Sequence, residues 1–201
     1  MASSKPTPKP RASRRGDTRE RALQVAVRLM QTRGYHGFTF QDVAQELGVS
    51  HVAVHHHYRT KADLVAAAMR VYTDGFDGLL EEIASSETEP RRMLKRYAGL
   101  FEATAADSET ICLCGALAAD FATLPEAVQP EIVRFYEHNE RWLQKVIASA
   151  LGTRSGAAKT RRMARGLVDA LEGAMVSARA FGDPSRVSSL VRLLLESWFA
   201  A

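Results

Sequence analysis

The chain has 201 residues, 46% of them hydrophobic, and a formal net charge of +4. This composition excludes a largely disordered chain and fits one compact unit or a small domain joined to a larger one. No apolar run approaches the roughly 20 residues of a membrane span, and the N-terminus lacks the apolar segment of a signal peptide. We therefore expect a cytoplasmic protein that does not enter a membrane.

Positive charge is concentrated in the first third of the chain. Residues 1–64 hold 11 Lys and Arg against 5 Asp and Glu, whereas the remaining residues hold 16 against 18. Five of the six histidines also precede residue 58. A positive field on one end of the protein favours binding to phosphate groups there.

Residues 1–16 are basic and contain prolines at positions 6, 8 and 10. Proline at this density, with almost no large apolar side chain, cannot form a core, so we expect a disordered basic arm. Such an arm can also follow the backbone of DNA or enter a minor groove. The sequence leaves open whether it touches DNA.

The predicted helices begin near Thr18, and the first of them ends at Gly34. In the second, Phe40, Val43, Ala44 and Leu47 have the i, i+3, i+4, i+7 spacing of one buried helical face.

A tight turn follows the second helix. Gly48 can take the left-handed conformation that ends a helix, and Ser50 can cap the next helix, residues 51–58. This third helix has few core residues among four histidines, so it is expected to contact something outside the fold. The spacing is that of a helix-turn-helix, which lays its second helix in the major groove.

The chain resembles the tetracycline-repressor (TetR) family from residue 18 to about residue 72. The matching pieces are ALQVAVRLMQTRGYHGFTF (residues 22–40), Asp42-Val43-Ala44, Leu47-Gly48-Val49-Ser50, and His57-Tyr58-Arg59-Thr60-Lys61 with Leu64. It departs from the family at Val54-His55, where Leu-Tyr is usual, and at His51-Val52, where Lys-Gly is frequent. The resemblance implies the docking mode on DNA but not the operator sequence.

The resemblance implies an all-α fold of about nine helices. It divides the chain into the arm (1–16), a helix-turn-helix DNA-binding domain (17–72), and a helical ligand-binding and dimerisation domain (73–201). Further helices are predicted at residues 90–106, 110–122, 125–151, 157–181 and 184–199.

The side chains expected to contact DNA lie at the helix-turn-helix. Thr39 and Lys61 stand at helix starts where phosphate is favoured, and Gln41 can pair with adenine. The full set is Thr39, Gln41, Ser50, His51, Val52, Ala53, His55, His56, His57, Thr60 and Lys61. His51 and His55, four residues apart, could also bind zinc, but no further ligand has suitable spacing. We therefore predict no metal and no cofactor.

Several side chains of the second domain are candidates to line a ligand pocket. They are Tyr97, Phe101, Cys112, Phe121, Phe135, His138, Trp142 and Met175, although aromatic residues at helical spacing also serve as plain core. Cys112 and Cys114 are too few for a disulfide framework and, two apart on a helix, point to different faces. Either thiol could sense an oxidant or electrophile, or pack as a small apolar group.

The last two helices are too apolar for helices with one wet face. Leu193-Leu194-Leu195 is followed by Trp198-Phe199, which requires a second buried face. In the resembled family these helices form a four-helix dimer interface. A two-fold dimer places two recognition helices about 34–36 Å apart, the spacing of successive major grooves.

These observations predict a dimeric transcriptional regulator, a repressor by resemblance, that binds a palindromic operator and responds to a small-molecule effector. The alternative is a DNA-binding switch that responds to redox state, electrophiles or metal through the cysteines or histidines. A DNA binder without sequence preference is a third reading. The sequence contains no nucleophile–base arrangement, phosphate loop or paired carboxylates, so no enzymatic activity is expected.

Overall fold

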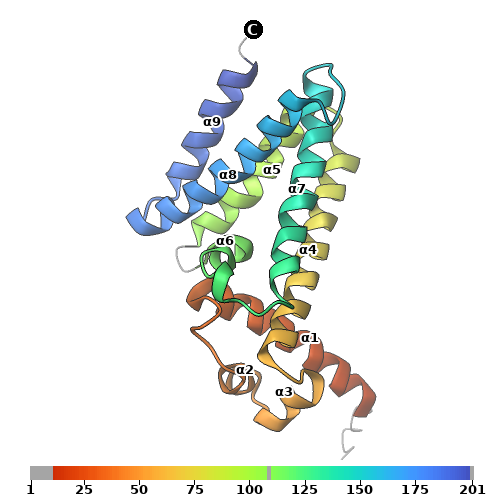
Figure 1. Cartoon of the computed structure of the whole chain (residues 1–201), viewed down its shortest axis with the longest axis vertical. Helices are drawn as coiled ribbons and strands as arrows, with labels where there is room; N and C mark the ends of the chain where they lie inside the picture. The colour runs from red at the N-terminus through yellow and green to blue at the C-terminus, as the bar shows by residue number, and fades with distance from the viewer. Residues whose placement is uncertain (1–10, 108–109, 200–201) are drawn as a thin grey trace, which may run out of the picture.

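The computed structural model describes residues 11–107 and 110–199, and within these ranges the fold is all-α (Figure 1). The described helices are α1 (Arg11–Arg33), α2 (Phe40–Leu47), α3 (His51–His57), α4 (Lys61–Ser86), α5 (Pro90–Ala106), α6 (Leu113–Ala118), α7 (Gln129–Ala150), α8 (Ala158–Phe181) and α9 (Ser185–Phe199), with a short 3₁₀ turn, η1 (Phe121–Thr123). The predicted fold class is confirmed, and in the described ranges no helix is long and apolar enough to cross a membrane.

The short helices gather at one end of the molecule. α1, α2 and α3 lie together there, while α4 and α7 run side by side along its length (Figure 1). At the other end α8 packs on both α7 and α9, and α9 also packs on α5. α6 lies between α1 and α7, in contact with both. A change at α6 therefore has a direct path to the three-helix end.

α1 is longer than predicted, because it begins at Arg11 and not near Thr18. The last of the closely spaced prolines is Pro10, and the residues after it are mostly Arg, Ala and Ser, which a helix tolerates. The prediction of a disordered arm is therefore wrong for residues 11–16. Its remainder, residues 1–10, lies outside the described residues.

The turns and caps of the helix-turn-helix agree with the predicted ones. Gly34 and Gly48 have φ of 71° and 64°, a region that glycine enters without a Cβ clash. Thr39 and Thr60 each close a capping box, with Asp42 and Asp63 respectively. The Ser50 hydroxyl accepts a hydrogen bond from the Ala53 N–H at 3.3 Å. Local chemistry alone therefore defines where α2, α3 and α4 begin.

The region predicted as one helix, residues 110–122, is divided. Cys112 is extended (φ −48°, ψ 128°) and stands before α6, and a separate 3₁₀ turn follows at Phe121. The extended segment is held by a tertiary contact, because Gln31 Nε2 donates to the Ile111 carbonyl at 3.1 Å. α7 likewise begins at Gln129 and not at Pro125, because the side-chain amide of Gln129 donates to the Leu124 carbonyl of the preceding loop.

α4 joins the two ends of the molecule without a break. Its first half buries Leu64, Val65, Ala68 and Met69, and its second half buries Leu80 and Ile83. The predicted boundary at residue 72 thus falls inside a continuous helix. A Cβ added at Gly75 or Gly78 would have no neighbouring atom within 4 Å. Close packing of α4 against another helix of the chain therefore does not require glycine at these two positions.

A pair of glycine variants tests the turn of the helix-turn-helix. We expect Gly48→Ala to destabilise the protein by about 1 kcal/mol, because alanine is strained at this positive φ although the space is open. Gly75→Ala, in a helix interior with equally open space, should instead stabilise it by roughly 0.5–1 kcal/mol. Denaturant unfolding measures both, and the same sign for the two variants would contradict this account.

Candidate nucleic-acid interface and buried polar cluster

The predicted DNA-contacting side chains gather on α3 and at the starts of α2, α3 and α4. Eight of them are exposed: Thr39, Gln41, Ser50, His51, Val52, His55, His56 and Thr60. Ala53, His57 and Lys61 are half-buried. Val52 is 74% exposed, more than any other large apolar side chain of the described residues, and is available for an apolar contact with an outside partner.

α3 is held in place by two side chains. Val54 is fully buried, and Tyr58, just after the helix, is 4% exposed. The Tyr58 hydroxyl donates to the Arg19 carbonyl of α1 at 3.2 Å. A helix of seven residues has little stability alone, so these anchors fix its orientation. The remaining polar face of α3 is then presented to solvent.

Two histidines of α3 make tilted and edge-to-face ring contacts with each other and with Phe40 of α2. The His55 ring lies 4.3 Å from the ring of Phe40 and 4.4 Å from that of His51, measured between centroids. Contact with the nearly buried Phe40 restricts the rotamers of both imidazoles. The described residues contain no group of three or more His, Cys, Asp or Glu able to hold a metal ion.

An open hollow of about 510 Å³ separates the exposed faces of α2 and α3, and it is lined by Gln41, Ala44, Gln45, Val49 and His51. Gln45, one helical turn after Gln41, was not among the predicted contacts. Its position on the same exposed face of α2 was the signal that could have identified it.

Lys61 points inward rather than freely to solvent. Its ammonium donates to the Tyr35 and Phe38 carbonyls, each at 2.5 Å, and lies over both of their rings. Burial lowers the pKa of Lys61, and the nearby Asp42 carboxylate partly offsets this. Two of three N–H donors are used, so the predicted phosphate contact is limited to one.

An aromatic cluster between α4, α5 and α7 includes some of the predicted ligand-pocket residues. Tyr97 stacks on Trp142 with centroids 5.7 Å apart and contacts Phe101, and Phe76 links these rings to Phe135. Two other predicted members show no ring contact with this cluster. Phe121 is 37% exposed on η1, and His138 pairs with Asp77 at 2.6 Å.

The His138–Asp77 pair belongs to a row of contacts between α4 and α7. Arg70 pairs with Glu131 at 2.5 Å, and Arg134 pairs with Asp74. The three rungs follow helical spacing on both helices and fix how α4 lies against α7. His138 therefore has a structural partner.

A buried carboxyl group, Glu172, is the feature that the sequence reading missed. It is 9% exposed, no N–H or O–H group donates to either carboxylate oxygen, and its interaction within the chain is with the Cys112 thiol. Oxygen Oε2 is so close to Gly115 that a Cβ built there would lie 2.4 Å from it. One signal was available, since Glu172 falls four residues after Val168 and three before Met175 on the apolar face of α8.

Glu172 lies beside the two thiols. Burial, followed by the charge of Cys112, raises the pKa of Glu172 to about 10, so this carboxyl is neutral at pH 7. A hydrogen bond with the Cys114 thiol lowers the pKa of Cys112, and burial raises that of Cys114. The two thiols therefore interact, contrary to the expectation that they face apart. Cys112 and Met175, both predicted pocket residues, are 3% and 2% exposed.

Comparisons with known proteins agree with this geometry. Residues 22–68 match the family model described as bacterial regulatory proteins, tetR family. The HTH-type transcriptional repressor KstR2 of Mycolicibacterium smegmatis is 31% identical over 98 residues, 49% of this chain. That match covers 44% of the relative, so the chain spans less than half of the length of the curated relative.

Solved structures match over nearly their whole length. A TetR-family transcriptional regulator from Agrobacterium tumefaciens is 28% identical with a TM-score of 0.85, covering 91% of this chain and 98% of that one. A TetR transcriptional regulator from Legionella pneumophila is 26% identical with a TM-score of 0.84, covering 90% and 96%. The similar proteins are regulators by name, in agreement with the prediction that the chain is not an enzyme.

The buried carboxyl predicts a pH dependence of stability. Native Glu172 keeps its proton up to about pH 10, whereas the unfolded chain releases it near pH 4.5. Between these values the native state binds more protons, so the contribution to stability falls as pH rises, by at most about 1.4 kcal/mol per pH unit.

Glu172→Gln removes this dependence. We expect its melting temperature to exceed that of the wild type by more at pH 8 than at pH 5, measured by calorimetry. Glu137→Gln, at an exposed position, is the control and should follow the wild type at both pH values. A difference independent of pH would show that Glu172 is not held neutral.

Proposed function

This chain belongs to the TetR family of bacterial regulatory proteins, and we propose that it acts as a dimeric, effector-responsive transcriptional repressor that binds a palindromic DNA operator. The observation that carries the proposal is α3, a seven-residue helix anchored by Val54 and Tyr58 with its histidines turned outward. The excess of positive charge in residues 1–64 supports it. In this proposal residues 17–72 bind DNA, residues 73–201 bind effector and partner, and the protein acts in the cytoplasm.

Phosphate contacts position the protein on the duplex. Thr39, Ser50 and Thr60 stand at the starts of α2, α3 and α4, where unpaired backbone N–H groups and the positive helix ends favour an oxygen anion. Lys61 supplies its one remaining N–H donor beside Thr60.

Base contacts come from the exposed faces of α2 and α3. Gln41 and Gln45 present amides at the hollow beside His51, and glutamine pairs best with adenine. His55, oriented by Phe40, donates or accepts at a base edge, and Val52 and Ala53 reach a thymine methyl. His56 and His57 complete the contact set.

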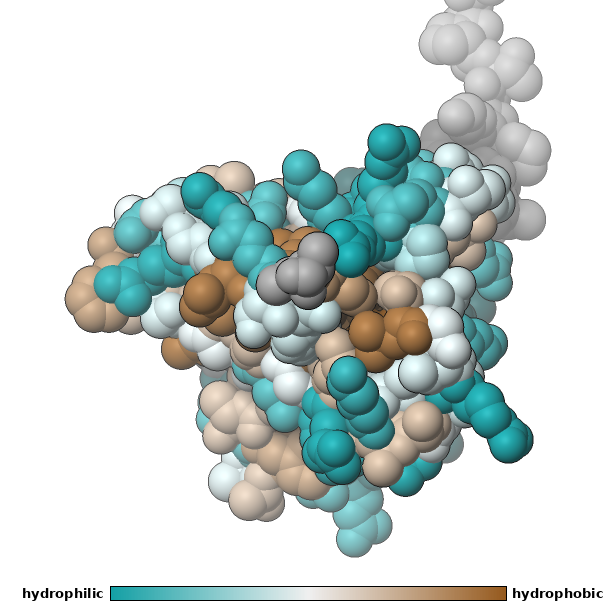
Figure 2. Space-filling view, turned by 90° about the horizontal axis from the view of Figure 1, so that it is seen from above, coloured by the Kyte–Doolittle hydropathy of each residue, from teal (hydrophilic) through white to brown (hydrophobic). Residues whose placement is uncertain are grey.

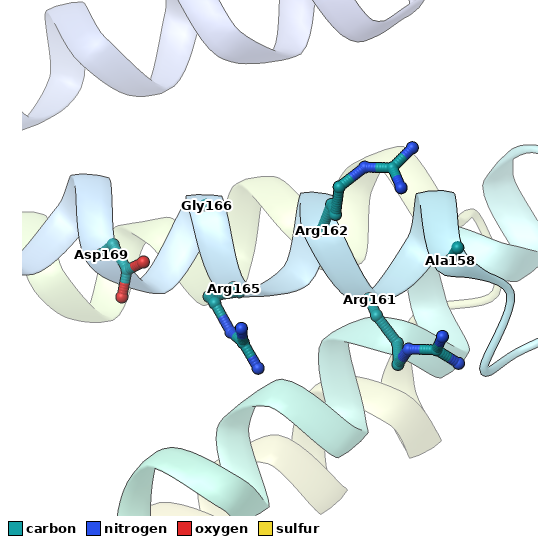
Figure 3. A pocket seen from close by; sticks show the side chains of 6 residues that line it. All are labelled: Ala158, Arg161, Arg162, Arg165, Gly166 and Asp169. Atoms are coloured by element: carbon teal, nitrogen blue, oxygen red, sulfur yellow. The ribbon is translucent and has the colours of Figure 1, made fainter.

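The dimer forms through the outer faces of α8 and α9. Exposed residues of α8 recur at intervals of four and three, namely Arg162, Gly166, Asp169, Gly173, Val176 and Ala180. This is the pattern of a helix–helix seam, and its small residues permit close approach. Figure 3 shows part of it, where Gly166 leaves bare backbone beside a hollow of about 450 Å³ that Arg162 and Asp169 also line.

Apolar side chains reach the surface on the same helices. Val176 on α8 is 53% exposed, and Leu193 on α9 is 63% exposed. Seen from the end opposite α2 and α3, hydrophobic surface lies among hydrophilic side chains (Figure 2). A second copy of the chain covers Val176 and Leu193 in the proposed dimer.

The effector acts through the end of α1. Arg179 of α8 donates to the Gln31 and Thr32 carbonyls at 3.3 and 3.2 Å, and Gln31 donates to Ile111 before α6. A ligand that binds better to a state with α6 displaced thereby changes the position of α1 and of the helix-turn-helix.

Selection of genomic fragments by the purified protein at fixed salt tests this function. We expect enrichment of one palindrome with half-sites about one helical turn apart. Equal recovery of unrelated fragments, with a steep salt dependence, would instead identify a DNA binder without sequence preference.

His55→Ala should weaken binding to the selected operator by about 1–3 kcal/mol and change binding to unrelated DNA little, because a base contact is lost. His36→Ala is the matched control, since His36 is exposed on the loop after α1 and bonds Thr123. Equal loss on all DNA sequences would make His55 a phosphate contact.

Val176→Arg should convert the dimer to a monomer, because it places a charge in the proposed seam. Light scattering after size-exclusion chromatography gives the mass, and operator affinity should fall with it. Val133→Arg is the control, because Val133 is 44% exposed on α7 and off this seam. A dimer that survives Val176→Arg would place the interface elsewhere.

A further inference from the structure

The carboxyl of Glu172 has no N–H or O–H partner in the interior of the molecule. Both of its oxygens are buried, and the interaction that the described residues offer it is with the Cys112 thiol, a weak hydrogen-bonding group. A buried polar group without a partner costs about 1–3 kcal/mol, and native proteins contain few of them. An apolar side chain at this position of α8 would avoid the cost. Its presence indicates a partner that comes from outside the chain.

The surroundings of this carboxyl define the charge of that partner. The acidic groups near it are Cys112 just before α6, Cys114 on α6, Tyr97 on α5 and Tyr136 on α7. Tyr72 on α4 contacts Cys112 at 3.9 Å. No cationic side chain among the described residues contributes to the pKa of the carboxyl. Such an interior repels an anion and lacks a counter-ion for its own carboxylate.

The walls and the access also fit an apolar molecule with a positive head. Tyr97 belongs to the aromatic cluster with Trp142, Phe101 and Phe76, whose ring faces attract cations. Met175, one turn after Glu172, lines a hollow of about 50 Å³ that it shares with Ala105 and Thr110. This hollow is too small for a ligand, and neither Glu172 nor α6 lines it. Gly115 of α6 lies directly against the Glu172 carboxyl, so binding there requires α6 to move away from α8.

We propose that Glu172 is the anchor of the effector site and that the effector is an organic cation, an ammonium group on an apolar body that pairs with this carboxylate between α6 and α8. The inference rests on the proposed effector-responsive function and adds the chemical class of the effector. The same displacement of α6 acts on α1 through the Gln31–Ile111 hydrogen bond.

Binding of a cation carries a proton signature. The carboxyl is neutral in the free protein at pH 7 and must ionise to pair with an ammonium group, so it releases one proton. The affinity for a ligand whose own charge is constant then rises by about tenfold per pH unit from pH 6 to 8. An effector that merely filled apolar space would show neither effect.

Calorimetric titration of the full chain with phenylbutylammonium and its trimethyl analogue tests the proposal, with phenylbutanol as the neutral control. Two buffers of different ionisation enthalpy report the protons released. We expect about one proton per bound cation, little binding of the alcohol, and at least about a tenfold loss of affinity, with no proton release, in Glu172→Gln.

Two further variants separate the role of the carboxyl from general damage. Gly115→Ala keeps the Glu172 carboxyl but places a Cβ against its Oε2, so it should weaken cation binding. Glu137→Gln, on the exposed face of α7, should bind as the wild type does. Circular dichroism verifies that each variant is folded.

The proposal is overturned if no ammonium ion binds, if phenylbutanol binds as well as the cations, or if binding releases no proton and survives Glu172→Gln. Cation binding that leaves operator affinity unchanged would also show that the site is not the effector site. These outcomes are separate from the DNA selection, because the titrations contain no DNA. A missing palindrome would overturn the repressor function without affecting the cation result.

Discussion

The end of α1 is where the two halves of this molecule are tied together. A helix leaves its last carbonyl groups without intrahelical partners. Here one cation from a distant part of the chain donates to those carbonyls, and a second donates to carbonyls of the turn that follows α1. Arg179 of α8 bonds the Gln31 and Thr32 carbonyls, and Lys61 at the start of α4 bonds those of Tyr35 and Phe38. Positive charge is also favoured at a helix C-terminus. The position of the helix-turn-helix relative to the larger helical part depends on these bonds.

This arrangement has a consequence for signalling. α4 is continuous from the helix-turn-helix into the helical part, and its row of charge pairs with α7 holds the two helices together. α6, by contrast, has only six residues and is preceded by an extended segment. A helix of six residues has little stability of its own, so it is displaced more readily than a long one when its tertiary contacts change. The element nearest to Glu172 is thus also one of the easiest to displace.

The interior polar cluster and the exposed recognition surface follow the same physical rule. A protein chain lowers its free energy by burying apolar groups and pairing polar ones. Departures from this rule occur where an outside partner completes the structure. Val52 is an exposed apolar side chain on α3, and Glu172 is an unpaired carboxyl inside the helical part. In the functions proposed here, DNA covers Val52 and a ligand pairs with Glu172.

The sequence by itself determined the elements whose boundaries depend on local chemistry. Glycines at positive φ, the Thr39 and Thr60 capping boxes and the spacing of Phe40, Val43, Ala44 and Leu47 act within a few residues, so the helix-turn-helix was predictable. The family resemblance added the all-α architecture of the rest.

Only the tertiary structure decided which side chains meet across the chain. The inward turn of Lys61, the pairing of His138 with Asp77 and the division of residues 110–122 all depend on contacts between residues far apart in sequence. Glu172 is the clearest case. A glutamate in a helix is usually expected to be solvent-exposed, and only the packing of α6 against α8 shows that this one is buried. Burial and partnership are properties of the packed molecule, and a one-dimensional pattern gives the face of a helix but not what lies against it.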